Sequence, residues 1–87
     1  MDPRHPTGPP PQVVAPLNED WPALRVPPAA PQPIDVVARI EWPGGEQHVP
    51  THAVAWTRTH VMVVVGDPRV GGRWALWLRA QDVRRRG

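Results

Sequence analysis

Apolar and polar side chains alternate between residues 34 and 42. Charged residues fill most of the intervening positions. An alternation with a period of two residues, in a segment rich in β-branched side chains, is typical of a strand with one buried face. The pattern therefore predicts a strand over residues 34–42. Its apolar positions are Ile34, Val36, Ala38, Ile40 and Trp42.

Shorter strand-like segments follow along the chain. They are separated by clusters of Gly, Pro and Asp, which favour turns. The sequence therefore predicts an all-β domain of about five short strands. The strand-like segments are 46–49, 54–57, 60–65, 73–78 and 83–85, and the predicted connections are 43–45, 50–53, 66–72 and 79–82.

The segment from Gly72 to Val83 reads as a strand, a short turn and a valine-led final strand. This layout resembles the SH3-like small barrels, which have about five short strands and a 3₁₀ turn before the last. The resemblance covers roughly residues 34–86 and implies a small closed barrel. The tyrosine-rich peptide groove of eukaryotic SH3 domains is not implied, because the chain has no tyrosine.

Proline is concentrated in the first third of the chain, with eleven of the fourteen prolines between Pro3 and Pro33. Proline fixes φ and removes a backbone donor, which disfavours helices and sheet ladders. We expect residues 1–33 to form a mostly disordered or extended arm and residues 34–87 to form the folded domain. Within the arm, Asn18 is expected to cap a short helical turn.

The hydrophobic pattern predicts an interaction face on the segments 60–65 and 73–78. If Val61, Val63 and Val65 point inward with Trp74, Leu76 and Leu78, other large apolar side chains point outward. Pairing of the two strands then places Met62 near Trp77 and Val64 beside Ala75. A contiguous apolar face is typical of an interface. We therefore expect a protein partner, or self-association, at Met62, Val64 and Trp77, with Arg73 and Arg79 at the rim.

Two alternatives to this exposed face stay open. In the first, the arm folds back and covers the face with Trp21 and Leu24. In the second, the strand register differs by one residue, which exchanges the two faces.

Charge is distributed unevenly. Residues 1–57 carry three Arg and six acids, a net charge of −3, whereas residues 58–87 carry seven Arg and two acids, a net charge of +5. Clustered arginines suit phosphate binding, and an exposed Trp77 could stack on a base. This predicts nucleic-acid binding as an alternative function, while the other reading is a solvated basic tail. The candidate residues are Arg58, Arg79, Arg84, Arg85 and Arg86.

Several kinds of chemistry are disfavoured by composition. The chain has no Ser, Cys, Tyr or Lys, so the usual nucleophiles are missing, and no enzyme activity is expected. His48, His52 and His60 lack the spacing and the companion ligands of a metal site, so neither a metal nor another cofactor is expected. No small-molecule substrate is expected. The longest apolar run, 61–65, is too short to cross a membrane, and a cytoplasmic location is expected.

These features favour a non-catalytic protein-interaction module with an accessory or regulatory role. The composition, rich in Arg, Pro, Ala, Val and Gly, is typical of GC-rich genomes such as those of an actinobacterium or its phage. Besides nucleic-acid binding, a third interpretation is a small structural subunit of a larger assembly.

Overall fold

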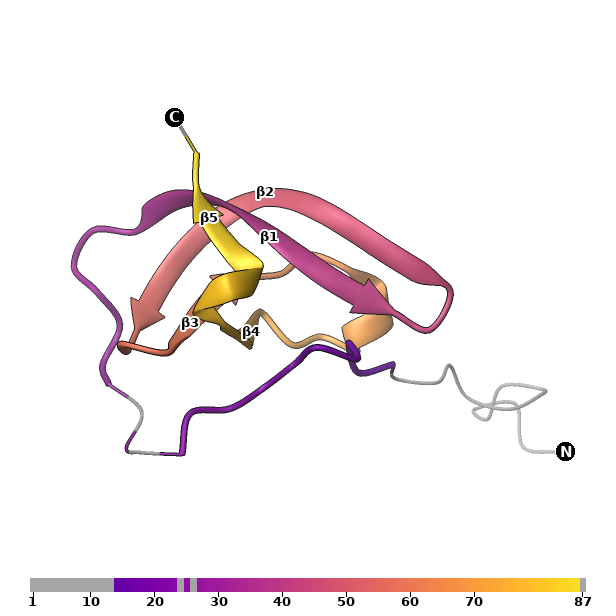
Figure 1. Ribbon diagram of the computed structural model, residues 1–87, viewed down its shortest axis with the longest axis horizontal. Helices are drawn as coiled ribbons and strands as arrows, with labels where there is room; N and C mark the ends of the chain where they lie inside the picture. Colours follow the sequence, from indigo (N-terminus) through magenta and orange to yellow (C-terminus); the bar gives the residue numbers. More distant parts are fainter. Residues whose placement is uncertain (1–13, 24, 26, 87) are drawn as a thin grey trace, which may run out of the picture.

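The computed structural model describes residues 14–23, 25 and 27–86. Within them, five antiparallel strands form one sheet (Figure 1), in the order β4-β3-β2-β1-β5. This confirms the prediction of an all-β domain with about five strands. The strands are β1 (Ile34–Trp42), β2 (Gly45–Trp56), β3 (His60–Val64), β4 (Ala75–Arg79) and β5 (Val83–Arg85).

The hairpin of β1 and β2 is longer than predicted. Trp42 pairs with Gly45 across a turn of Pro43 and Gly44, and the pairing continues to Ile34 opposite Ala53. The predicted turn at 50–53 is wrong, because these residues lie inside β2. β2 pairs with β1 along most of its length, including Pro50 opposite Val37, and with β3 only from Ala53 onward, so the ladder with β1 overrides the local turn preference of Pro50.

A β-bulge between Ala53 and Ala55 marks the place where β2 pairs with β3. Val54 is the extra residue, and such a bulge bends the strand and increases its twist. On the other side of β3, Met62 lies opposite Trp77 and Val64 lies opposite Ala75. The predicted register of this strand pair is therefore confirmed.

One hydrophobic cluster fills the concave side of the sheet. Leu76, Leu78 and Val63 belong to it, as the alternation predicts. The prediction that Trp74 points inward is wrong. Trp74 is 61% exposed because β4 begins one residue later, which places it outside the alternating pattern. The cluster consists of Val36, Ala38, Ile40, Trp42, Ala53, Val63, Val70, Leu76 and Leu78.

Two short 3₁₀ helices interrupt the second half of the chain. The first, η1 (Pro68–Val70), lies in the predicted loop 66–72, and the second, η2 (Ala80–Asp82), lies directly before β5. β4 and β5 form the two edges of the sheet, so the expected barrel is not closed. β5 is only three residues long and pairs with Val36–Ala38 of β1, which leaves a gap between the edges.

Residues 14–23 of the arm run beneath the sheet, and residues 27–33 then lead up to the start of β1 (Figure 1). The helical turn expected after Asn18 does not form, because the Asn18 side chain bonds to β1 instead. The arm predicted to be mostly disordered or extended covers residues 1–33, and of these, residues 1–13, Leu24 and Val26 lie outside the described residues. Among the residues that the structure describes, no helix is long and apolar enough to cross a membrane.

Candidate functional site

A row of side chains crosses the outer face of the sheet over three strands. Ala55 of β2 pairs with Met62 of β3, which pairs with Trp77 of β4. Ala55 and Trp77 are buried but do not belong to the core cluster, whereas Met62 is half-buried. A second layer must therefore cover this outer row.

The arm forms this second layer. The ring of Trp21 packs on the ring of Trp77, with centroids 6.4 Å apart and planes tilted by 48°. Trp77 is only 1% exposed, so the prediction of an exposed Trp77 is wrong. Val64, like Met62, is half-buried. The register was right, but periodicity indicates only which side of a strand a residue takes, and not whether another segment covers that side. The structure matches the alternative in which the arm folds back.

The backbone of the arm pairs with the edge of β4. The amide of Asp20 donates to the carbonyl of Trp77 at 2.9 Å, and Glu19 forms an isolated antiparallel bridge with Leu78. An unpaired strand edge is a template for another extended chain. Here the chain's own arm occupies that edge.

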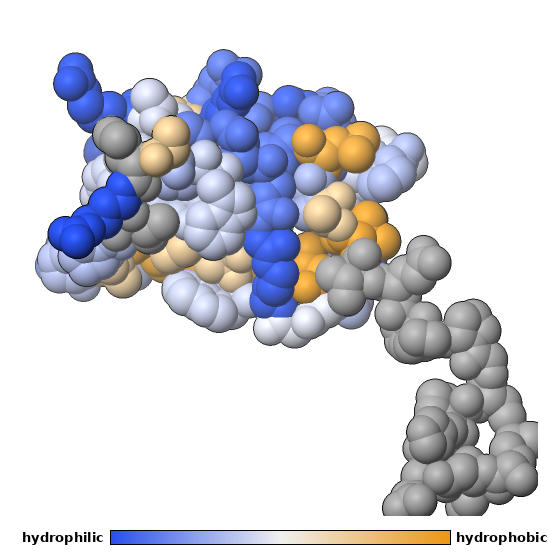
Figure 2. Space-filling model, turned by 90° about the horizontal axis from the view of Figure 1, so that it is seen from below, coloured by the Kyte–Doolittle hydropathy of each residue, from blue (hydrophilic) through white to orange (hydrophobic). Residues whose placement is uncertain are grey.

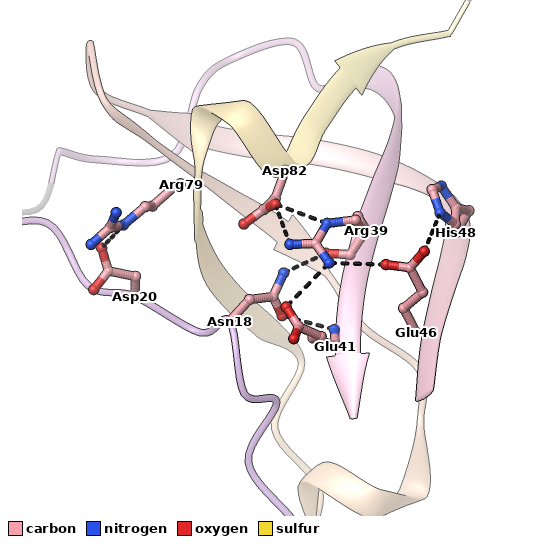
Figure 3. Close-up of polar contacts among 8 residues, drawn as sticks. All are labelled: Asn18, Asp20, Arg39, Glu41, Glu46, His48, Arg79 and Asp82. Atoms are coloured by element: carbon pink, nitrogen blue, oxygen red, sulfur yellow. Dashed lines mark hydrogen bonds and ion pairs between the residues drawn. The ribbon is translucent and has the colours of Figure 1, made fainter. Parts of the chain in front are cut away.

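The preceding arm residues bond to the opposite end of the sheet. The amide of Leu17 donates to the Glu41 carbonyl at 2.6 Å. The Asn18 side chain accepts from the Glu41 amide at 2.8 Å and donates to the Arg39 carbonyl at 2.7 Å (Figure 3). Arg39 and Glu41 lie just beyond the β1 residues that pair with β5. Residues 17–20 therefore span the gap that keeps the sheet from closing.

Two arginines, one at the end of β4 and one just before it, bind the acids of the arm. Arg73 donates through Nη1 to Glu19 Oε1 at 3.1 Å and through Nη2 to Glu19 Oε2. Arg79 Nε donates to Asp20 Oδ2 at 2.9 Å (Figure 3). The hydrogen bonds that Arg73 donates to Glu19 raise the pKa of Arg73. Arg73 and Arg79 were predicted at the rim of the apolar face, and here they flank the covered row.

His60 takes part in the same contact. Its Nε2 lies 2.8 Å from Asp20 Oδ2, and its Nδ1 lies 2.7 Å from the hydroxyl of Thr59. His60 is the first residue of β3, and its side chain is only 13% exposed. The hydrogen bond with His60, followed by that from Arg79, lowers the pKa of the Asp20 carboxyl. Asp20 is thus held as a carboxylate between the imidazole of His60 and the guanidinium of Arg79.

Arg39 is the centre of a neighbouring polar cluster (Figure 3). It donates to Asp82 Oδ1 through Nε at 3.0 Å and through Nη2 at 2.9 Å. Its Nη1 contacts Glu46 at 2.9 Å and Glu41 at 3.1 Å. Hydrogen bonds from Arg39 and then from His48 lower the pKa of Glu46. The cluster ties η2 to β1 and β2, and thereby fixes the platform on which Asn18 docks.

The remaining candidate cations lie at the other end of the domain. Arg84, Arg85 and Arg86 are exposed, and so is Arg58 in the β2–β3 connection. Of the predicted nucleic-acid residues, Arg79 is set apart, because it pairs with the arm. Among the described residues, no group of three or more His, Cys, Asp or Glu side chains could hold a metal ion.

Sequence reasoning missed the acids Glu19 and Asp20 as parts of the site. The opposite net charges of the two halves of the chain were the available signal, because oppositely charged segments attract each other. Seen from the arm side, strongly hydrophilic groups form a band across the face, with more hydrophobic groups on either side (Figure 2).

Comparison with protein families, curated proteins and solved structures gives no match for this chain.

Proposed function

We propose that this chain is a non-catalytic protein-interaction domain, and that its outer β3–β4 face binds an extended acidic segment that carries a tryptophan. The observation behind the proposal is the seating of Leu17–Trp21 on that face. This segment combines edge pairing on β4, two ion pairs and aromatic packing on Trp77. Addition of a strand to a sheet edge is a general mode of peptide recognition.

In this proposal the arm is a tethered competitor. A tethered segment competes at an effective concentration in the millimolar range, so a partner segment must displace it or bind when it is released. Such competition suits an accessory or regulatory factor, because the face becomes available only when a partner of matching chemistry is present.

We also propose that the fold is of the SH3-like type. The strand order, with β1 between β2 and β5, supports this, as does the 3₁₀ turn directly before the last strand. In this interpretation the arm takes the place of the missing closure between the strand edges.

A peptide titration tests the function. A labelled peptide with the sequence of residues 14–23 is titrated with the full chain and with the variant Glu19→Arg/Asp20→Arg, in which the arm acids repel Arg73 and Arg79. We expect the variant to bind the peptide at least about tenfold more tightly than the natural chain, because its own arm no longer competes.

The matched control is the same peptide with Gln and Asn in place of its two acids, and we expect it to bind more weakly. The proposal fails if the variant keeps its β-sheet circular dichroism spectrum and yet binds neither peptide, or binds both equally well.

A further inference from the structure

A groove with an apolar floor opens at the end of the domain away from the β1–β2 turn. It lies between β5 and the ends of β2 and β3, on a different part of the surface from the arm contact. Trp56, at the end of β2, is 41% exposed there. The residues that line the groove include Ile34, Trp56, Val61, Val83, Arg84 and Arg85.

Arginines of the domain divide into two groups according to their acidic partners. Arg69 pairs with Asp67, and Arg73 and Arg79 pair with the acids of the arm. Within the described ranges, by contrast, Arg84 and Arg85 make no ion pair with an acid. Arg86 reaches Asp35 only at 3.9 Å. Within residues 34–86, positive charge without an acidic partner therefore lies at or next to the groove.

Position along the chain adds another cation to this patch. Thr57 lines the groove, and the exposed Arg58 follows it. An arginine patch beside an accessible indole matches the requirements of a single-stranded nucleic acid. The bases stack on the aromatic ring, and the phosphates pair with cations along the groove. An acidic peptide supplies negative charges for the arginines. Unlike a nucleic acid, it does not supply a flat ring in every repeating unit that could stack on the indole.

We propose that the groove beside Trp56 binds single-stranded nucleic acid. One base stacks on Trp56 over the aliphatic floor, and Arg84, Arg85 and Arg58 contact the adjoining phosphates. The site is independent of the proposed peptide-binding face, since it uses neither the arm nor Trp77.

Fluorescence anisotropy of a labelled thymidine oligonucleotide tests this site in the full chain. We expect dissociation constants of about 10⁻⁶ to 10⁻⁴ M that rise steeply with salt, as for nucleic-acid binding without sequence preference. Trp56→Leu should weaken binding by at least about fivefold, because stacking on the ring is lost. Arg84→Gln should reduce the salt slope by about 0.7 if one phosphate contact is lost.

Controls separate this site from general charge attraction. Arg69→Gln changes the net charge by the same amount at the far end of the domain, and we expect it to leave the affinity within about twofold of the natural chain. An abasic oligonucleotide of equal length should bind more weakly and be insensitive to Trp56→Leu.

Three results would overturn the proposal. One is equal loss of affinity in Arg69→Gln and Arg84→Gln. Another is equal binding of the abasic strand. The last is tighter, Trp56-dependent binding of a labelled oligo-aspartate peptide, which would assign the groove to an acidic protein partner. Circular dichroism of each variant shows that the fold is retained.

Discussion

The indole of Trp21 in the arm covers the indole of Trp77 on the outer face of β4, with ring centroids 6.4 Å apart. This contact joins the two parts into which proline content divides the chain. The contact also explains why Trp77, which lies outside the core cluster, is only 1% exposed.

Replacement of the two tryptophans should lower the free energy of unfolding by very different amounts. Trp77→Ala should lower the free energy of unfolding by about 3–5 kcal/mol, because a buried aromatic side chain is removed. Trp21→Ala should cost only about 0.5–1.5 kcal/mol, the value of an aromatic pair, because Trp21 itself is largely exposed.

Urea denaturation of both variants measures this difference. If Trp77→Ala leaves too little folded protein, Trp77→Phe keeps a ring in the site and should fall between the two. Equal stability of Trp77→Ala and Trp21→Ala would contradict the burial of Trp77.

Acid should release the arm. The Asp20 carboxyl has a pKa below 3.8, its usual value, because His60 and Arg79 bind the charged form. Its contribution to arm docking is therefore fully present above pH 3.8 and is lost as the pH falls through the lowered pKa. We expect a change in tryptophan fluorescence below pH 3.8 that is weaker in Asp20→Asn. The control Asp35→Asn removes an exposed acid paired with His52, and it should leave the transition unchanged.

Substitution in the Arg39 cluster should lower stability most at Asp82, the buried end of the cluster. Asp82 is 8% exposed and accepts two bonds from Arg39, whereas Glu46 is exposed. An ion pair whose carboxylate is shielded from water and accepts two hydrogen bonds contributes more than a pair with a solvent-exposed carboxylate. Asp82→Asn should therefore lower the urea midpoint more than Glu46→Gln. The reverse order would show that the contacts of Arg39 with η2 add little.

One loop glycine should resist substitution. Gly72 has φ +83°, a region that L-residues rarely adopt, so Gly72→Ala should cost about 1–2 kcal/mol. Gly66 in the same loop has no positive φ, and open space surrounds the position of an added Cβ. Gly66→Ala should be neutral or stabilising by up to about 1 kcal/mol. Thermal denaturation of the pair tests this, and equal melting temperatures would contradict the backbone assignment.

The local alternation of apolar and polar residues was sufficient to predict much of the sheet. Alternation located β1, the pairing of β3 with β4, and the inward positions of Leu76 and Leu78, because these depend on neighbours within one or two strands. It failed at Pro50, where the long ladder between β1 and β2 outweighs the turn preference of the residue. It also failed at Trp74, which lies one residue before its strand begins.

The candidate site was harder to predict, because it joins segments that are distant in sequence. Asn18 bonds to β1, and Asp20 bonds to β4, and neither contact leaves a periodic signal. The composition of the arm favoured a disordered or extended chain, but composition does not say where such a chain docks. The apolar face on the segments 60–65 and 73–78, which the arm could cover with Trp21, and the charge difference between the two halves were the signals that pointed to their association.

Nuclear Overhauser effects between the indole rings of residues 21 and 77 in the full chain test the central claim most directly. If the arm closes the gap between the sheet edges, cross-peaks join the two rings near neutral pH, and they disappear in Glu19→Arg/Asp20→Arg. A well-dispersed β-sheet spectrum with both indoles assigned and no cross-peak between them would contradict the account.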